Sequence, residues 1–264
     1  MHIVMACDKA YLPHVASVVL QFHMQGSADT FHILTSEPED VTFDMQNKLC
    51  ALHADLHFHC IYPELLQMFQ VRKRHLSKST FLRLFAPLVL NSEGVQYALY
   101  LDADILLMDY ESMRKNIAEC IMMMKHFGVP FSAVEDGACT YLGKMPRIFN
   151  AGVLLMDVHM LETHNFLDRC KWIAEYCSLE EEDQSILNIY ANSSGWITMH
   201  GGMNNQRIRN YSDNEPLQDG ICIKHFVGEL KPWNYKSSTQ KVANPFLLDK
   251  YMWFEDVARE VAGI

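Results

Sequence analysis

The chain has 264 residues, of which 49% are hydrophobic and 20% charged, so it can bury a substantial core. This composition excludes a disordered or low-complexity protein. The formal net charge of −10 argues against nucleic acid as a partner, because nucleic-acid binding relies on basic residues that neutralise phosphates.

The first sixty residues alternate between extended and helical patterns. Residues 2–7 are a short apolar run that ends at Asp8, which is typical of a first strand. Helical spacing predicts a helix over 11–24, and two further strands are expected over 30–34 and 55–61. This alternation favours an α/β protein with a mostly parallel, doubly wound sheet flanked by helices. The opening residues lack the apolar stretch of a secretory signal, and no apolar run reaches the length of a membrane span, which predicts a cytoplasmic protein.

A helix is expected next over 77–90, and it carries Arg83 among apolar neighbours. An arginine in such a place most often caps a carbonyl or extends to solvent. Its planar group could instead bind an anion or a sugar hydroxyl in a site.

The stretch 96–109, QYALYLDADILLMD, is the centre of the prediction. Its first half is a strand buried on both faces, and it ends in Asp102 and Asp104. Side chains two apart on an extended backbone point the same way, so the two carboxylates are expected to share a divalent ion such as Mn²⁺ or Mg²⁺. A simple polar turn and a phosphatase of the Asp-x-Asp type are the alternatives, although Ile105-Leu106 fits the phosphatase motif poorly.

Two more strands are expected beyond this stretch, after a helix over 112–119. The first covers 131–134 and is followed by Asp136. The second covers 147–158 and has Asn150-Ala151-Gly152 at its entrance. A glycine within a strand indicates a bulge or the close approach of another group.

The last third of the chain carries more polar candidates. Helices are predicted over 161–176 and 179–190, the latter opened by a capping box of Ser178 and Glu181, and an irregular loop over 196–209. A strand over 220–226 leads to His225, followed by Gly228 and Lys231, a grouping that suits a diphosphate. A polar linker and a helix over 245–261, expected to pack on the domain, complete the chain.

In this order the motifs resemble those of the family-8 glycosyltransferases, retaining enzymes of the GT-A fold that include bacterial lipopolysaccharide galactosyl- and glucosyltransferases. The resemblance covers about residues 1–235, which would form the catalytic domain, with 236–264 as a linker and C-terminal helix. It rests on these motifs: Ala6-Cys7-Asp8, Thr80–Leu84, LYLDAD at 99–104, FNAGVLLMD at 149–157, DQSILN at 183–188 and HFVGELKPW at 225–233.

The resemblance implies a metal-dependent hexosyltransferase that uses a UDP-hexose, with galactose or glucose as the sugar. Asp102, Asp104 and His225 would bind Mn²⁺, with Mg²⁺ as the alternative ion, and Gly228 and Lys231 would hold the phosphates. The acceptor would be a saccharide, glycolipid or glycoprotein, as in lipopolysaccharide biosynthesis. Contact with the inner face of the membrane would be peripheral, and the oligomeric state is left open.

Further roles follow from the same resemblance. Three residues would contact the uridine: Ala6, Asp8 and Ala103. Four residues would surround the donor sugar: Arg83, Asn150, Asp183 and Gln184. Gln184 would lie beneath the anomeric carbon, Asp136 near the acceptor, and His75 along the donor pocket. Lys9-Ala10 departs from the polar Asp-Asn pair of similar enzymes, so a non-catalytic nucleotide-sugar-binding protein of the same fold is a further alternative.

Overall fold

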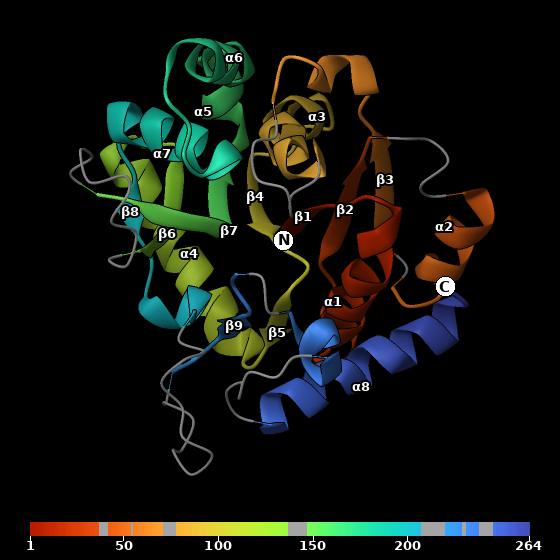
Figure 1. Cartoon of the computed structure of the whole chain (residues 1–264). Helices are drawn as coiled ribbons and strands as arrows, with labels where there is room; N and C mark the ends of the chain where they lie inside the picture. The colour runs from red at the N-terminus through yellow and green to blue at the C-terminus, as the bar shows by residue number, and fades with distance from the viewer. Residues whose placement is uncertain are drawn as a thin grey trace.

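The computed structural model describes residues 1–36, 42–53, 55–70, 78–136, 147–206, 220–228, 231–237 and 245–264. Within these ranges, seven strands form the main sheet in the order β3-β2-β1-β4-β7-β6-β8 (Figure 1). Their bounds are β1 (His2–Ala6), β2 (Thr30–Thr35), β3 (Leu56–Cys60), β4 (Tyr97–Leu101), β6 (Phe131–Glu135), β7 (Phe149–Asp157) and β8 (Ile197–Thr198). A separate antiparallel pair consists of β5 (Ile105–Leu107) and β9 (Ile223–His225).

Strands β3, β2, β1 and β4 run parallel, and β7 runs antiparallel to both of its neighbours, β4 and β6. Strand β8 is parallel to β6. The sheet is therefore mixed and mostly parallel, which confirms the predicted class. The carboxyl ends of the parallel strands, where such sheets bind ligands, lie at the same edge as the start of β7.

Helices cover both faces of the sheet. The α-helices are α1 (Leu12–Met24), α2 (Phe43–Cys50), α3 (Ala86–Ser92), α4 (Tyr110–Phe127), α5 (Val158–Thr163), α6 (Phe166–Tyr176), α7 (Glu182–Ser194) and α8 (Pro245–Ala262). The 3₁₀ turns are η1 (Lys9–Tyr11), η3 (Pro63–Leu66), η4 (Lys78–Phe85), η5 (Gly201–Asn204) and η6 (Pro232–Ser237). Among the described residues, no helix combines the length and the apolar character that crossing a membrane requires.

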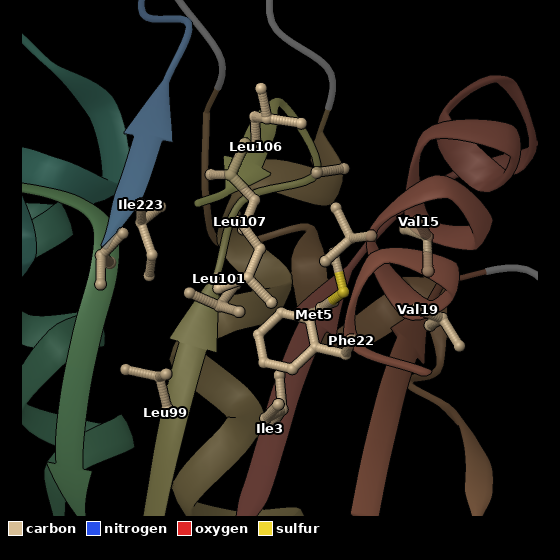
Figure 2. Packing of buried hydrophobic residues seen from close by; sticks show 14 of the residues in the cluster. Ile3, Met5, Val15, Val19, Phe22, Leu99, Leu101, Leu106, Leu107 and Ile223 are labelled. Carbon is tan, nitrogen blue, oxygen red and sulfur yellow. The ribbon is translucent and has the colours of Figure 1, made fainter. Parts of the chain in front are cut away.

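The two faces of the sheet have separate cores. Alternate residues of β1 point to opposite faces, so Ile3 and Met5 pack with α1, α4 and α8, whereas Val4 packs with η4, α3, α5 and α7. Figure 2 shows the first core, in which Phe22 of α1 lies against strand residues including Met5 and Leu101. Helix α8 lies across α1 on this face (Figure 1).

Helix α4 extends beyond the predicted 112–119 in both directions. Asp109 caps it, because its side chain accepts a hydrogen bond from the Ser112 backbone N–H at 2.9 Å. Gly128 ends it with a left-handed φ of 63°, and its N–H donates to the Met124 carbonyl. Both ends therefore follow from standard capping chemistry that the apolar spacing alone did not indicate.

The predicted helix over 77–90 is wrong in its form, because it consists of the 3₁₀ segment η4 followed by α3. Pro87 in the first turn of α3 has no N–H, and its ring would clash with the Arg83 carbonyl in a continuous α-helix. In a 3₁₀ helix, residues three apart lie on the same side. Thr80 and Arg83 therefore face the same neighbour, and this places Arg83 in the site described below.

Three other predictions need correction. The helix over 161–176 is two helices, because Asn165 between them has a left-handed φ of 54°. The capping box of Ser178 and Glu181 is wrong: α7 begins at Glu182, and the Glu181 backbone N–H donates instead to the Ser185 hydroxyl at 2.8 Å. The segment 196–209, which was predicted as an irregular loop, contains β8 and η5. Just after β8, the Met199 N–H donates to the Ala133 carbonyl of β6 at 2.7 Å, so the chain still runs beside the sheet there.

Candidate active site

The site is built around the connection between β4 and β5, which carries Asp102 and Asp104. Strand β5 pairs with β9 so that Ile105 lies opposite His225. The His225 Nε2 atom is 3.6 Å from Asp102 Oδ2 and 3.2 Å from Asp104 Oδ1. Ligand atoms of all three residues lie within 4.8 Å of one another. The two carboxylates and the distant imidazole therefore converge, as predicted.

Gly152 of β7 allows this convergence. A Cβ atom added to Gly152 would lie 2.2 Å from His225 Cε1 and 2.7 Å from Asp102 Oδ2. No side chain larger than hydrogen fits these separations. The glycine within the strand therefore marks the close approach of another group, which was one of the two meanings that the sequence allowed.

Asn204 of η5 and Asn150 of β7 fix the orientation of His225. Asn204 Nδ2 donates to Asn150 Oδ1 at 3.1 Å, so the Oδ1 of Asn204 faces His225 Nδ1 at 2.9 Å and accepts a hydrogen bond from its N–H. With a metal ion bound, the proton would stay on Nδ1 and the lone pair of Nε2, the nitrogen nearest the two carboxylates, would face the ion. Three electron-rich ligands facing one another fit a divalent cation, and an oxygen-rich set suits Mn²⁺ or Mg²⁺.

Lys231 lies beside the same carboxylate. Its Nζ donates to Asp104 Oδ2 and, at 3.0 Å, to the Phe226 carbonyl. Burial alone would raise the pKa of Asp104, but the neighbouring His225 and Lys231 lower it well below its usual range. Burial would lower the pKa of Lys231, but Asp104 raises it above its ordinary value. Both groups therefore stay charged at neutral pH.

Arg83 connects this cluster to α7. Its Nη2 is 3.0 Å from Asp102 Oδ1 and its Nε is 2.8 Å from Asp183 Oδ2, while Nη1 donates to the Ala151 carbonyl at 3.0 Å. Burial would lower the pKa of Arg83, but Asp102 and Asp183 raise it. The Thr80 hydroxyl donates to the other oxygen of Asp183 at 2.6 Å. Asp183 is thus held from η4 by one hydrogen bond and one ion pair, although its Oδ2 accepts no hydrogen bond.

Gln184 reaches the entrance of β7. Its Oε1 accepts a hydrogen bond from the Ala151 N–H at 3.0 Å. One turn later, Asn188 accepts from the Phe149 N–H at 2.8 Å and donates to the Phe149 carbonyl at 2.9 Å. The side chains of α7 thus hold the start of β7, which carries Asn150, at the site.

The residues expected to contact the nucleoside lie at neighbouring strand ends. Ala6 is the last residue of β1, and Asp8 caps η1 by accepting from the Tyr11 N–H at 3.2 Å. The Ser79 hydroxyl donates to the other oxygen of Asp8 at 3.0 Å. The Ala103 carbonyl accepts a hydrogen bond from the Tyr251 hydroxyl of α8 at 3.2 Å.

Three predicted residues are not joined to this network by the contacts described above. Asp136 follows β6 at the same edge of the sheet, where its N–H donates to the Ile148 carbonyl at 2.8 Å. Gly228 is exposed, has a φ of 88° and has open space where a side chain would be. His75 lies outside the described residues.

Several residues that contact the site were not predicted from the sequence. Tyr100 donates its hydroxyl to Asp102 Oδ1 at 2.8 Å, and the Arg83 guanidinium lies 4.5 Å from the centre of its ring. Asn204 was assigned only to an irregular loop. Tyr100 had one signal, a hydroxyl two residues before Asp102 and therefore on the same side of the strand. Thr80 and Asn204 had none, because their partners are distant in sequence.

Two curated relatives align with most of the chain. It is 26% identical to the glycosyltransferase GlyF of Streptococcus pneumoniae serotype 4 over 245 residues, which are 88% of this chain and 57% of GlyF. It is 27% identical to the glycosyltransferase GlyB of the same organism over 258 residues, 90% of this chain and 59% of GlyB. The chain thus spans less than two thirds of the length of these relatives.

Solved structures share the fold. An active-site mutant of LgtC matches with a TM-score of 0.72 and 18% identity, covering 97% of this chain and 96% of that one. The galactosyltransferase LgtC in complex with donor and acceptor sugar analogs matches with a TM-score of 0.68 and 20% identity, covering 100% and 95%. The fold is therefore of the GT-A type, as predicted.

The sequence profile of glycosyl transferase family 8 matches residues 2–237. This range contains every predicted site residue and stops before α8. Because the match covers most of the chain, the chain belongs to glycosyl transferase family 8.

Proposed function

We propose that this glycosyltransferase moves a hexose, galactose or glucose, from a UDP-sugar to a saccharide, glycolipid or glycoprotein acceptor with the help of a divalent ion. The observation that carries the proposal is the convergence of Asp102, Asp104 and His225, in which His225 Nε2 lies 3.2 Å from Asp104 Oδ1. The family assignment favours this function over a phosphatase of the Asp-x-Asp type.

Asp102, Asp104 and His225 would hold the ion, Mn²⁺ or alternatively Mg²⁺. When bound, it would stabilise the negative charge that develops on the leaving diphosphate. Lys231 would place a second positive charge at the same edge, and it is held there by Asp104 and the Phe226 carbonyl. Gly228 would let the backbone approach the phosphates, since its surroundings are open.

Four residues would line the donor sugar: Arg83, Asn150, Asp183 and Gln184. Asp183 is a poor candidate for a nucleophile, because its Oδ1 accepts a hydrogen bond from the Thr80 hydroxyl and its charge is paired with the Arg83 guanidinium. Gln184 has an uncharged amide whose oxygen accepts from Ala151. These contacts support direct attack on the same face of the sugar. The bond from the anomeric carbon to the diphosphate oxygen would break, the bond to the acceptor oxygen would form, and the diphosphate would take the acceptor's proton.

The remaining roles stay predictions from the sequence. Ala6, Asp8 and Ala103 would contact the uridine, and the hydrogen bond from Ser79 supports an ordered carboxylate at Asp8. Asp136 would lie near the acceptor, and His75 would line the donor pocket. The division into a catalytic domain over 1–235 and an appendage over 236–264 is also a proposal, as is a cytoplasmic location with peripheral contact at the inner face of the membrane.

The test is incubation of the purified chain with UDP-galactose or UDP-glucose and Mn²⁺, with release of UDP measured. We expect slow hydrolysis of one donor, faster release with a sugar acceptor, and loss of both with EDTA. Asp104→Asn should lower turnover about 10²- to 10³-fold. The control Asp168→Asn, an exposed acid on α6, should not change turnover.

Two outcomes would count against the proposal. Binding of UDP-sugar without hydrolysis or transfer would indicate a non-catalytic binding protein of the same fold. Full activity in EDTA, or in Asp104→Asn, would contradict the metal role of the carboxylates.

A further inference from the structure

A group of histidines lies on the main sheet, away from the carboxylates of the candidate active site. Side chains alternate along a strand, and the parallel register aligns Val4 with His32, His32 with His57, and Leu34 with His59. His32 of β2 and both histidines of β3 therefore share one face of the sheet, together with His2 of β1. This face is covered by α3, and Glu93 follows the end of that helix.

The distances within this group are short. His32 Nδ1 lies 3.0 Å from His59 Nε2 and 3.4 Å from Glu93 Oε2, and His59 Nδ1 lies 3.6 Å from Glu93 Oε1. One ligand atom from each of His32, His59 and Glu93 lies within 4.8 Å of the others. On its far side, His32 Nε2 contacts His2 Nδ1 at 3.0 Å.

The nitrogen and oxygen atoms that face one another in this group are also potential metal ligands. Nδ1 of His32 lies close to two other such atoms, a ring nitrogen of His59 and a carboxylate oxygen of Glu93. A cation placed among these atoms would satisfy all three, with the proton of His32 on Nε2 facing His2.

We propose that His32, His59 and Glu93 form a second metal site, for Zn²⁺ or a similar late first-row ion. Ligands about 2.1 Å from a tetrahedral ion lie about 3.4 Å apart. His32 Nδ1 lies 3.0 Å from His59 Nε2 and 3.4 Å from Glu93 Oε2, and one ligand atom of each residue lies within 4.8 Å of the others. Two imidazoles with one carboxylate favour Zn²⁺, whereas carboxylate-rich sites favour Mn²⁺ and Mg²⁺.

The site is open on one side. The side chain of His32 is 1% exposed and that of Glu93 is 37% exposed, so an ion could enter past the carboxylate and keep a water as its fourth ligand. The bound ion would connect the outer strands β2 and β3 to the end of α3. It shares no residue with the proposed Mn²⁺ site, so it does not depend on the proposed function.

His57 provides a matched control. His57 lies on β3, as His59 does, and on the same face of the sheet. Its ring is stacked on that of His32, with the ring centres 5.4 Å apart. Its Nε2, however, contacts Asp55 Oδ1 at 2.9 Å, so this nitrogen is directed to another partner. Replacement of His57 should therefore leave the ligand set complete.

The experiment uses the metal-free chain of residues 1–264 carrying Asp102→Asn and Asp104→Asn, so that the active site does not compete. Titration with Zn²⁺ against a chromophoric chelator should give one bound equivalent. Loss of a residue that only hydrogen-bonds to a metal ligand weakens metal binding about 10- to 100-fold. Loss of a ligand itself should cost more, so Glu93→Gln and His59→Gln should each weaken Zn²⁺ binding by more than about 100-fold. His57→Gln should change it only a few-fold.

Cobalt substitution provides a second measurement that does not require activity. Bound Co²⁺ should give the intense visible bands of a tetrahedral ion, and both ligand variants should lose them while keeping the circular dichroism of the parent. Should the double aspartate background fail to fold, the unsubstituted chain should bind two equivalents and the ligand variants one. Equal Zn²⁺ affinity in Glu93→Gln, His59→Gln and the parent, or no bound equivalent in the parent, would overturn the proposal.

Discussion

At the scale of single residues, the site depends on where side chains are absent as much as on where they are present. Gly152 leaves room for His225 and Asp102, which could not approach a side chain on β7. Asn150, two residues earlier, accepts from the Gly152 N–H at 3.0 Å as well as from Asn204. The entrance of β7 thus places the imidazole and limits its rotation.

Replacement of Gly152 tests this close approach. In Gly152→Ala the new methyl group would overlap His225 Cε1, so we expect displacement of the ring and loss of Mn²⁺-dependent UDP binding. Calorimetric titration with UDP and Mn²⁺ measures the effect. Gly201→Ala is the matched control, because a Cβ at Gly201 meets no atom within 4 Å. Equal affinities in the two variants would show that the site tolerates the methyl group.

At the scale of elements, segments distant in sequence support the loop that carries Lys231. Trp233 of η6 stacks on His14 of α1, with ring centres 3.5 Å apart. His14 Nδ1 contacts Glu255 Oε2 of α8 at 2.9 Å, and Arg259 donates to the other oxygen of Glu255 at 2.8 Å. The C-terminal helix is therefore connected through buried polar contacts to the region of the proposed phosphate-binding residues.

Glu255 makes the stability of α8 dependent on acidity. Burial would raise the pKa of Glu255, but the contacts with His14 and Arg259 lower it below its ordinary value. A lowered carboxyl pKa in the folded state stabilises the fold above the unfolded-state pKa of about 4.3, and this stabilisation is lost as the pH falls further.

The variant Glu255→Gln tests this coupling. Urea unfolding at pH 7 should show a loss of about 1–3 kcal/mol relative to the parent, because a buried charge-assisted contact is removed. The difference in the free energy of unfolding should shrink below about pH 4, where protonation of Glu255 removes the same stabilisation from the parent. Glu260→Gln, an exposed acid on the same helix, is the control. A difference that does not depend on pH would point to packing as the cause.

At the scale of the whole molecule, the mixed sheet brings two halves of the chain together. The strands β1 to β4 supply Asp8, Asp102 and Asp104, whereas β7, α7 and β9 supply Asn150, Gln184 and His225. The antiparallel strand β7 lies next to β4, and the Asp102 N–H donates to the Gly152 carbonyl at 2.8 Å. The site therefore exists only when both halves are folded.

Ligand binding across the two halves should stabilise the entire fold. With UDP and Mn²⁺ at about 100 times the dissociation constant, linkage predicts a gain of about 2.7 kcal/mol in the free energy of unfolding. Thermal unfolding should show a higher Tm with both ligands than with either alone. EDTA should remove the increase. A rise caused by UDP that EDTA leaves unchanged would separate nucleotide binding from the metal.

Much of this could be read from the sequence. Apolar periodicity located the strands that flank the site, and the ordered motifs identified the family and the three converging residues. Local rules failed where a local feature interrupts the apolar pattern or a distant contact determines the structure. Pro87 interrupts the helix that the apolar spacing predicted. Helix α7 begins at Glu182 and not after Ser178, the start that the capping box predicted. Its first turn is held by distant contacts, from Asp183 to Arg83 and from Gln184 to Ala151.

The sequence by itself determined which residue types stand at the strand ends, because short-range sterics and the burial of apolar side chains set the strands. Only the tertiary structure decided that Thr80, Tyr100 and Asn204 serve the site, and that histidines of separate strands meet Glu93. The physical reason is that a hydrogen bond or a metal ligand depends on separations of a few ångströms. Strand register and helix packing set those separations between residues that are far apart in the chain.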